Sequence, residues 1–287
     1  MHEPVLVSEV LEYLHIVKNG RYIDATVGAG GHTKQILLQG GEVLGIDQDN
    51  EMLEVAQRTL EQLACPNFKL VKANFSQIEQ VAKENRFYPV NGILFDLGVS
   101  SLHYSWKNRG FSFESPQSPL DMRLDRSLSV TAADLLNSLR PDQLEQLFVE
   151  IMPRDAKKLS RQIVQFRQSK KFETVEDFLK VCQILHSKSS KNPATVSFMA
   201  LRIAVNSEFE NIAQALPDAV KLLSPGGRML VISFHSLEDS QVSNIFRELK
   251  NTDKVKIITK VGISPSPDEI RANPRSRSAR LRVIEKI

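Results

Sequence analysis

Apolar and polar residues follow two different periods along the first hundred residues of the chain. Short apolar stretches predict strands over residues 20–27, 41–49, 68–75 and 90–100. Amphipathic stretches between them predict helices over residues 5–16, 32–39, 50–63 and 76–85. Strands that alternate with helices form βαβ units, so this part of the chain predicts a mostly parallel sheet with helices on both faces.

The pattern changes near residue 99. Residues 102–129 are rich in serine, proline and aromatic residues, and helical patterns follow over residues 131–139, 141–151, 155–168 and 175–185. Thr174 is a suitable N-cap for the last of these helices. A long helix from Pro193, a turn at 224–227 and strands at 228–236, 254–260 and 279–287 restore the sheet pattern, the last two as a closing antiparallel pair. We therefore predict a core in two parts, residues 1–98 and 193–287, interrupted by an all-helical insertion at residues 99–192.

The composition narrows the class of protein. With 287 residues, 41% of them hydrophobic and 25% charged, the chain can bury one large core, or one core and a smaller second domain. We expect a cytoplasmic protein without a membrane partner, because no basic and apolar leader and no uncharged stretch of membrane-spanning length is found. Cys65 and Cys182 are isolated, and the histidines lack ligand spacing, so we expect no disulfide and no metal.

Charge is distributed unevenly along a chain whose net charge is only +3. Residues 271–282 carry five arginines and no acid. In a second basic stretch, Lys157, Lys158, Arg161 and Arg167 recur at a helical period and are followed by Lys170 and Lys171. Local basic patches suit a phosphate-rich partner, although a solvated basic surface explains them equally well on composition alone.

The stretch "DATVGAGGHT", residues 24–33, lies between a predicted strand and a predicted helix. Its glycines permit a tight turn and allow a ligand to approach the backbone. No Gly-Lys-Ser/Thr follows, which excludes a phosphate-binding P-loop, and Thr33 occupies the position where a dinucleotide fingerprint has its third small residue. Asp47 ends the next strand and can accept both ribose hydroxyls of either NAD or S-adenosylmethionine. The loop and this acid therefore predict a nucleoside cofactor without selecting one.

The ends of the later strands favour S-adenosylmethionine. Asn74 and Phe75 end the third predicted strand, where an adenine ring would lie, and Asp96 lies at the carboxyl end of the fourth. Aspartates at the ends of strands one, two and four are the spacing of class I methyltransferases, which have a Rossmann-like core. Asp96 could instead cap a loop, and Phe75 could belong to the hydrophobic core.

These motifs closely resemble the bacterial family of ribosomal RNA small-subunit methyltransferases H, also called MraW. The resemblance rests on "HEPVL", "DATVGAGGHT", "GIDQD", "FDLGVSS", "RGFSF", "SPLDMR", "NPAT", "LRIAVNSE", "LSPGGRMLVISFHSLED" and "NPRSRSARLR", in this order. It implies methylation of the exocyclic N4 of one cytidine in the decoding region of small-subunit (16S) ribosomal RNA, with S-adenosylmethionine as cofactor. The implied cofactor contacts are Gly30, Gly31, His32, Asp47, Phe75, Asp96 and His103, the last at a position where the family usually has glutamine.

The chemistry then suggests roles for further residues. Cytosine N4 is a weak nucleophile, so a hydrogen-bond acceptor on N4–H would help the reaction. We expect this acceptor on Asp96 or the backbone of the turn at residues 97–101, with Ser100 and Ser101 orienting the base. The target base must leave its stack. Trp106 and Phe111 could stack on it, although Phe111 could instead anchor the inserted domain. Arg109 could contact phosphate, and His235, at the end of a later strand on the cofactor side, could contact the substrate. Ser236 with Asp239 could equally well cap a helix there.

The predicted partner is small-subunit ribosomal RNA in an assembled or late-assembly particle. The insertion would recognise it, and Arg275, Arg277 and Arg280 would contact its backbone. Two other readings stay open: an RNA-binding assembly factor with a vestigial cofactor site, and an NAD-linked oxidoreductase. Departures from the family pattern at residues 150–153, Val196 and Met199 are the support for the first. The sequence does not decide between a monomer and a homodimer.

Overall fold

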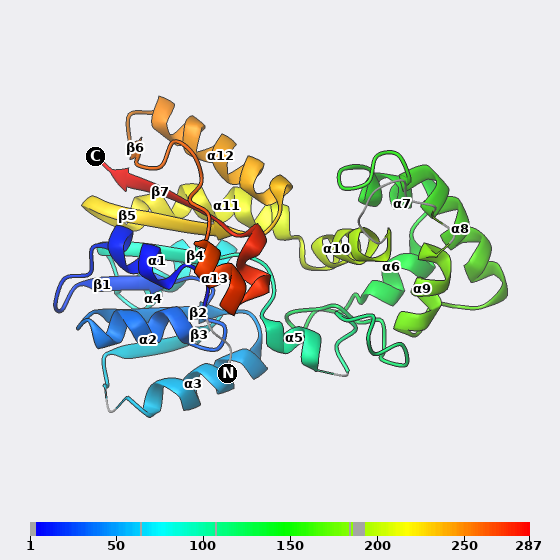
Figure 1. Ribbon diagram of the computed structural model, residues 1–287, viewed down its shortest axis with the longest axis horizontal. Helices are drawn as coiled ribbons and strands as arrows, with labels where there is room; N and C mark the ends of the chain where they lie inside the picture. The colour runs from blue at the N-terminus through cyan, green and yellow to red at the C-terminus, as the bar shows by residue number, and fades with distance from the viewer. Residues whose placement is uncertain (1–3, 64, 107, 184, 186–192) are drawn as a thin grey trace. The chain divides into compact units, whose positions relative to one another are not determined.

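The computed structural model describes residues 4–63, 65–106, 108–183, 185 and 193–287. The chain forms two compact units, one made of residues up to Val99 and from Phe209 onward, the other of residues 100–208. Each unit is followed separately in Figure 1. No helix within these described residues is long and apolar enough to cross a membrane.

The first unit contains a sheet of seven strands in the order β3-β2-β1-β4-β5-β7-β6. The strands are β1 (Arg21–Asp24), β2 (Glu42–Asp47), β3 (Phe68–Lys72), β4 (Val90–Asp96), β5 (Leu223–Ser233), β6 (Val255–Ile257) and β7 (Arg280–Lys286). The first five are parallel to one another, and β7 lies antiparallel between β5 and β6. The predicted closing antiparallel pair and the mostly parallel sheet are therefore confirmed, and this order is that of a Rossmann-like class I methyltransferase core.

Helices cover both faces of the sheet. The helices of this unit are α1 (Val7–Leu14), α2 (Gly31–Leu38), α3 (Asn50–Glu61), α4 (Ile78–Glu84), α11 (Glu208–Leu222), α12 (Ser236–Asn251) and α13 (Pro267–Ala272), with 3₁₀ turns η1 (Phe75–Gln77) and η2 (Pro274–Ser278). Along β4, Ile93 and Phe95 pack with residues of α4, α11 and α12, whereas Leu94 packs with residues of α1 and α2. This alternation explains why consecutive residues Ile93, Leu94 and Phe95 are all apolar: each face of the strand is buried there.

The second unit is helical, as predicted. It contains α5 (Ser101–Ser105), α6 (Ala132–Ser138), α7 (Pro141–Val149), α8 (Ala156–Ser169), α9 (Val175–Cys182) and α10 (Pro193–Asn206). Thr174 caps α9 in a capping box with Asp177. Stacked and edge-on phenylalanine rings build its core, among them Phe148, Phe172, Phe178 and Phe198.

The predicted long helix from Pro193 is two helices. Ser207, with φ at 48°, separates α10 from α11. Because α10 packs on α6, α7 and α9, the contacts assign it to the helical unit, and the boundary lies at residue 208 instead of 192. The predicted boundary itself falls next to residues 186–192, which lie outside the described residues.

Candidate active site

The carboxyl ends of four neighbouring strands carry the predicted acids of the first unit. Asp24 ends β1, Asp47 ends β2 and Asp96 ends β4, and residues 234–238 follow β5. Strands β1 and β4 lie side by side at the centre of the sheet, with β2 beyond β1 and β5 beyond β4. Successive strands thus run outward in opposite directions from this pair, and ligands of open α/β sheets bind at such a switch point.

The glycine loop connects Asp24 to α2. The buried Asp24 carboxylate accepts hydrogen bonds from the Thr26 N–H (3.3 Å) and from the Thr33 hydroxyl (2.6 Å). Gly28 and Gly30 have φ values of +53° and +84°, a conformation in which side chains are strained. The glycines therefore shape the turn, and α2 begins directly after it at Gly31 with its positive dipole end toward the loop.

Thr33 has a role that the sequence did not suggest. It counted only as a mismatch to a dinucleotide fingerprint, yet its hydroxyl holds the Asp24 carboxylate in the buried turn. Burial raises the pKa of Asp24 to about 6, against the lowering effect of this hydrogen bond. The sequence feature that could have suggested this contact is the spacing of Thr33, nine residues after Asp24 at the end of the strand.

Asp47 is fixed by backbone donors. Its carboxylate accepts hydrogen bonds from the N–H groups of Gly28 and Asp49, both at 2.9 Å. The side chain is half-buried, and a carboxylate has about four acceptor sites, more than these two backbone groups occupy. This arrangement suits the paired hydroxyls of a ribose.

Phe75 lies in η1, directly after β3. It packs against the core edge-on to Phe95, with ring centroids 5.9 Å apart, and remains half-buried. Phe75 can therefore both belong to the hydrophobic core and contact an adenine, because only part of its ring is buried. The Asn74 side chain is used locally: it accepts from the Ser76 N–H and donates to Gln48.

Asp96 lies close to His32 and to the charged side chains of Asp24 and Glu238. Its Oδ2 is 3.8 Å from His32 Nε2, and its backbone N–H donates to the Thr26 hydroxyl at 2.6 Å. Among the described residues, its buried Oδ1 has no hydrogen-bond partner. Burial, together with the charges of Asp24 and Glu238, raises the pKa of Asp96 to about 8. A carboxyl group in this state can exchange a proton near neutral pH.

The segment after β5 corrects the predicted helix cap. His235, not Ser236, is the N-cap of α12, and its Nδ1 accepts from the Glu238 N–H at 3.3 Å. Its Nε2 lies 3.0 Å from Glu238 Oε1, and Glu238 also accepts from the Phe234 N–H. His235 is thus engaged with its own helix, whereas the buried Glu238 is the group that acts on Asp96. In the sequence, Glu238 appears only within the motif that ends in "SFHSLED".

The basic C-terminal segment returns to the same edge of the sheet. Because β7 runs antiparallel to β5, Arg280 at its start pairs with Ser233 at the end of β5. Arg275 and Arg277 are exposed on η2, immediately before. Arg282 is not available to a ligand, because it forms a two-fold ion pair with Asp239 at 2.7 and 2.8 Å.

The remaining predicted residues belong to the helical unit. Ser100 caps α5 by accepting from the Leu102 N–H, and Ser101 begins that helix. His103 is buried, with its ring centroid 5.3 Å from that of Trp106 and 5.4 Å from that of Phe111. Trp106 is half-buried and Phe111 buried, so Phe111 anchors this segment and is not an open stacking surface.

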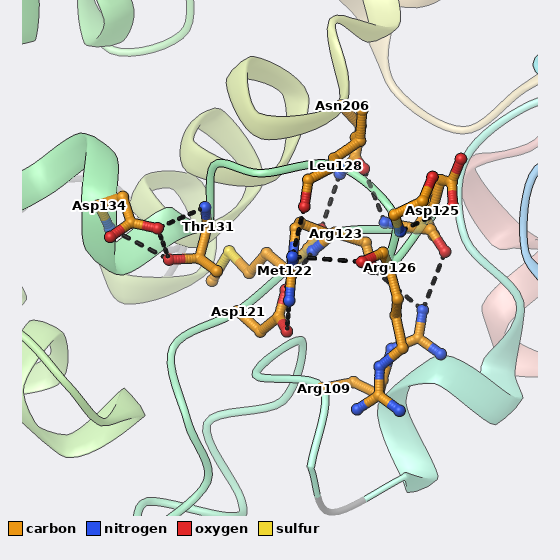
Figure 2. A network of polar contacts seen from close by, with 12 residues as sticks. Arg109, Asp121, Met122, Arg123, Asp125, Arg126, Leu128, Thr131, Asp134 and Asn206 are labelled. Carbon is orange, nitrogen blue, oxygen red and sulfur yellow. Dashed lines mark hydrogen bonds and ion pairs between the residues drawn. The ribbon is translucent and has the colours of Figure 1, made fainter.

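Arg109 corrects a prediction. We expected a phosphate contact, but Arg109 is 1% exposed and its guanidinium donates to the carbonyls of Arg123 and Leu124. It also lies over the rings of Trp106 and Phe111. Figure 2 shows it next to the turn of residues 121–126, which Asn206 holds from α10 by bonds to Met122 and Leu124. The arginine supports this loop from inside.

Comparison with known proteins identifies the family. The sequence profile of the MraW methylase family matches residues 1–287. The chain belongs to the MraW methylase family. It is 42% identical to ribosomal RNA small subunit methyltransferase H of Dictyoglomus thermophilum and 41% identical to that of Dictyoglomus turgidum, each over 100% of this chain and 97% of the relative. Among solved structures, an rRNA methylase from Streptococcus thermophilus covers 100% of this chain and 99% of its own at 11% identity, with a TM-score of 0.48.

The protein is therefore a methyltransferase that uses S-adenosylmethionine. The residues of the first unit fit this cofactor. The glycine turn precedes the positive end of α2, and Asp47 presents carboxylate acceptors for a ribose. The acidic groups at Asp24, Asp96 and Glu238 suit a positively charged sulfonium, and a buried Asp96 oxygen still needs a partner. Within the described residues, no group of three or more acids, histidines and cysteines could hold a metal ion.

Proposed function

We propose that the protein methylates the exocyclic N4 of one cytidine in the decoding region of small-subunit ribosomal RNA, within an assembled or late-assembly particle in the cytoplasm. The family and the names of its relatives support a ribosomal RNA substrate. The observation that carries the chemistry is Asp96: a carboxyl group at the switch point, with one oxygen lacking a partner among the described residues.

Asp96 would serve as the acceptor for the amine. S-adenosylmethionine, when bound, supplies a methyl group activated by a sulfonium. The cytosine N4 lone pair is delocalised into the ring, so a hydrogen bond from N4–H to Asp96 Oδ1 would localise it while the new N–C bond forms. The methylated nitrogen must then lose a proton, and Asp96 Oδ1 can take it.

The charge neighbours of Asp96 match this role. In the free protein its pKa of about 8 keeps most of it protonated at pH 7. A cation nearby favours the ionised form, so we expect cofactor binding to release a proton from Asp96. Methyl transfer would move the positive charge from the sulfonium to N4, which makes the N4 proton acidic enough for Asp96 Oδ1 to take it.

Other residues of the first unit would hold the cofactor. We assign the ribose to Asp47, the adenine to Phe75 and the remaining contacts to Gly30, Gly31 and His32. Ser100, Ser101, His103 and Trp106 stay predictions for orienting the base and for cofactor contact, and His235 stays a prediction for substrate contact.

One experiment tests the proposal. The protein is incubated with S-adenosylmethionine and small subunits that lack the modification, and the digested nucleosides are analysed by mass spectrometry. We expect N4-methylcytidine from the wild type and none from the Asp96→Asn variant. Cofactor binding without this product would favour the assembly factor, and tight NAD binding without S-adenosylmethionine binding would favour the oxidoreductase.

A further inference from the structure

Helix α8 of the second unit has an exposed surface without acids. The buried positions Ala156, Leu159, Ser160 and Ile163 lie on one side of the helix. The exposed positions lie on another and comprise Lys157, Lys158, Arg161, Gln165, Gln168 and Ser169. Their spacing of three, four and seven residues places the first five on one face, about 16 Å long at the rise of an α-helix. We call these six residues the α8 stripe.

Contacts separate the basic residues of this region into two groups. Arg167 donates to the carbonyls of Leu136 and Leu139, and Lys170 forms an ion pair with Asp177 at 2.7 Å. These two serve the fold. Lys157 and Arg161 are exposed, and the structure records no hydrogen bond or ion pair for them with any described residue. Arg154, just before the helix, and Lys171, just after it, are exposed as well.

The position of the stripe does not benefit the helix. Lys157 and Lys158 lie in the first turn of α8, which contains no acidic residue. The positive end of the helix dipole is there, so cations in the first turn are unfavourable and acids are favoured. A basic stripe that exists only for solubility would have no reason to begin at this end.

We propose that the α8 stripe binds the phosphate backbone of the ribosomal RNA substrate, as an anchoring surface on a different unit from the methyl-transfer site. This inference rests on the proposed function, because it assumes an RNA substrate. Lysines and arginines without acids between them attract phosphates, and glutamines on the same face can donate to backbone or sugar oxygens.

The test uses the full-length double variant Lys157→Gln/Arg161→Gln, since glutamine retains helix propensity. Binding to protein-free small-subunit rRNA and to unmodified small subunits is measured as a function of salt. We expect the slope of log affinity against log salt to become flatter by about 1.4 to 1.8 for two lost charges, and the affinity at 0.1 M salt to fall about tenfold or more. The KM for subunits should rise, with kcat and the affinity for S-adenosylhomocysteine unchanged.

The matched control is Lys250→Gln/Lys254→Gln. It removes two exposed lysines of the first unit, near the start of β6 and away from the strand ends that carry the aspartates. This control should leave the salt slope unchanged. The melting temperature of the α8 variant should equal or exceed that of the wild type, because cations are removed from a first turn and its neighbouring turn.

Three outcomes overturn the proposal. An unchanged salt slope in the α8 variant would make the stripe a solvated surface. Weaker binding to subunits but unchanged binding to free rRNA would indicate an acidic protein as the partner. A loss shared equally by the control variant would indicate a general effect of net charge. A wild type that neither binds nor methylates rRNA would instead refute the proposed function.

Discussion

Asp47 and Asp96 are the same residue type at equivalent strand ends, yet their surroundings give them different chemistry. Asp47 accepts hydrogen bonds from two backbone N–H groups, which fix its orientation. Asp96 is placed near two other acids and has an oxygen without a partner among the described residues, which favours its protonated form. The first is suited to hold a neutral hydroxyl group, and the second to accept or release a proton.

Replacing Asp47 by alanine should weaken cofactor binding. Two ribose hydroxyls would lose a charged acceptor, at about 1.5 kcal/mol or more each, which corresponds to roughly 100-fold in affinity. Calorimetric titration with S-adenosylhomocysteine measures the effect, with Asp47→Asn as the variant that keeps one acceptor and an intermediate affinity. Unchanged binding in Asp47→Ala would show that the ribose lies elsewhere.

The pH dependence of methylation should report Asp96. In the free protein its pKa is about 8, so the ionised form that we propose as the N4–H acceptor becomes populated as pH rises through this value. The kcat/KM for S-adenosylmethionine reports the free enzyme, and we expect it to increase with pH through this range. In Glu238→Gln a charge that raises the pKa of Asp96 is removed, so the rise of kcat/KM with pH should occur at lower pH. A rise at the same pH in the wild type and in Glu238→Gln would contradict the assignment, and the exposed Glu84→Gln serves as control.

At the scale of elements, tight turns and strand direction determine where functional segments lie. Strand β7 runs opposite to β5, and this direction alone brings η2 and Arg280 to the edge where the aspartates are. In the second unit, the loop before α6 passes so close to Gly110 that no side chain could be placed there. Both features follow from backbone geometry.

Substitution of Gly110 by alanine should destabilise the second unit. Its φ is +72°, and an added Cβ would lie 2.5 Å from the Pro119 carbonyl oxygen. Gly226→Ala is the matched control, because its φ is +78° but no atom lies within 4 Å of the added carbon. We expect a loss of about 1 kcal/mol for the control from backbone strain and clearly more for Gly110→Ala, measured by denaturant unfolding. Equal losses would mean that the loop moves away without cost.

Simultaneous replacement of Arg275, Arg277 and Arg280 by glutamine should weaken RNA binding. Three lost phosphate contacts would flatten the salt slope by roughly 2 to 3. The affinity for S-adenosylhomocysteine should stay unchanged, because we assign these side chains to RNA and other residues to the cofactor. A salt slope equal to that of the wild type would show that these arginines do not contact RNA and form a solvated basic surface.

At the scale of the whole molecule, the chain is interrupted once and resumes the same sheet. The first unit buries residues from both ends of the sequence. Its strands β4 and β5 are neighbours in the sheet, although the whole second unit, residues 100–208, lies between them in the sequence. The second unit has its own aromatic core around Phe178, which is fully buried. Separate cores predict separate stabilities.

A Phe178→Ala variant tests this separation. Loss of a buried ring costs about 3 to 5 kcal/mol, and it should appear in the unfolding of the second unit. Hydrogen exchange should speed up across α7 to α10 and remain unchanged in the sheet. Binding of S-adenosylhomocysteine to Asp47 and the glycine loop should be retained. Faster exchange throughout both units would show that they unfold as one.

The sequence alone determined the order of strands and helices, the α/β class and the positions of Gly28, Gly30, Asp47 and Asp96, because burial period and turn chemistry are local properties. Only the tertiary structure decided the rest. It divided the predicted long helix at Ser207, placed Arg109 inside a loop instead of on its surface, and made His235 a helix cap. It also brought Glu238 close enough to act on Asp96. The physical reason is that burial, charge coupling and hydrogen-bond partners depend on residues far apart in the chain, which no local pattern contains.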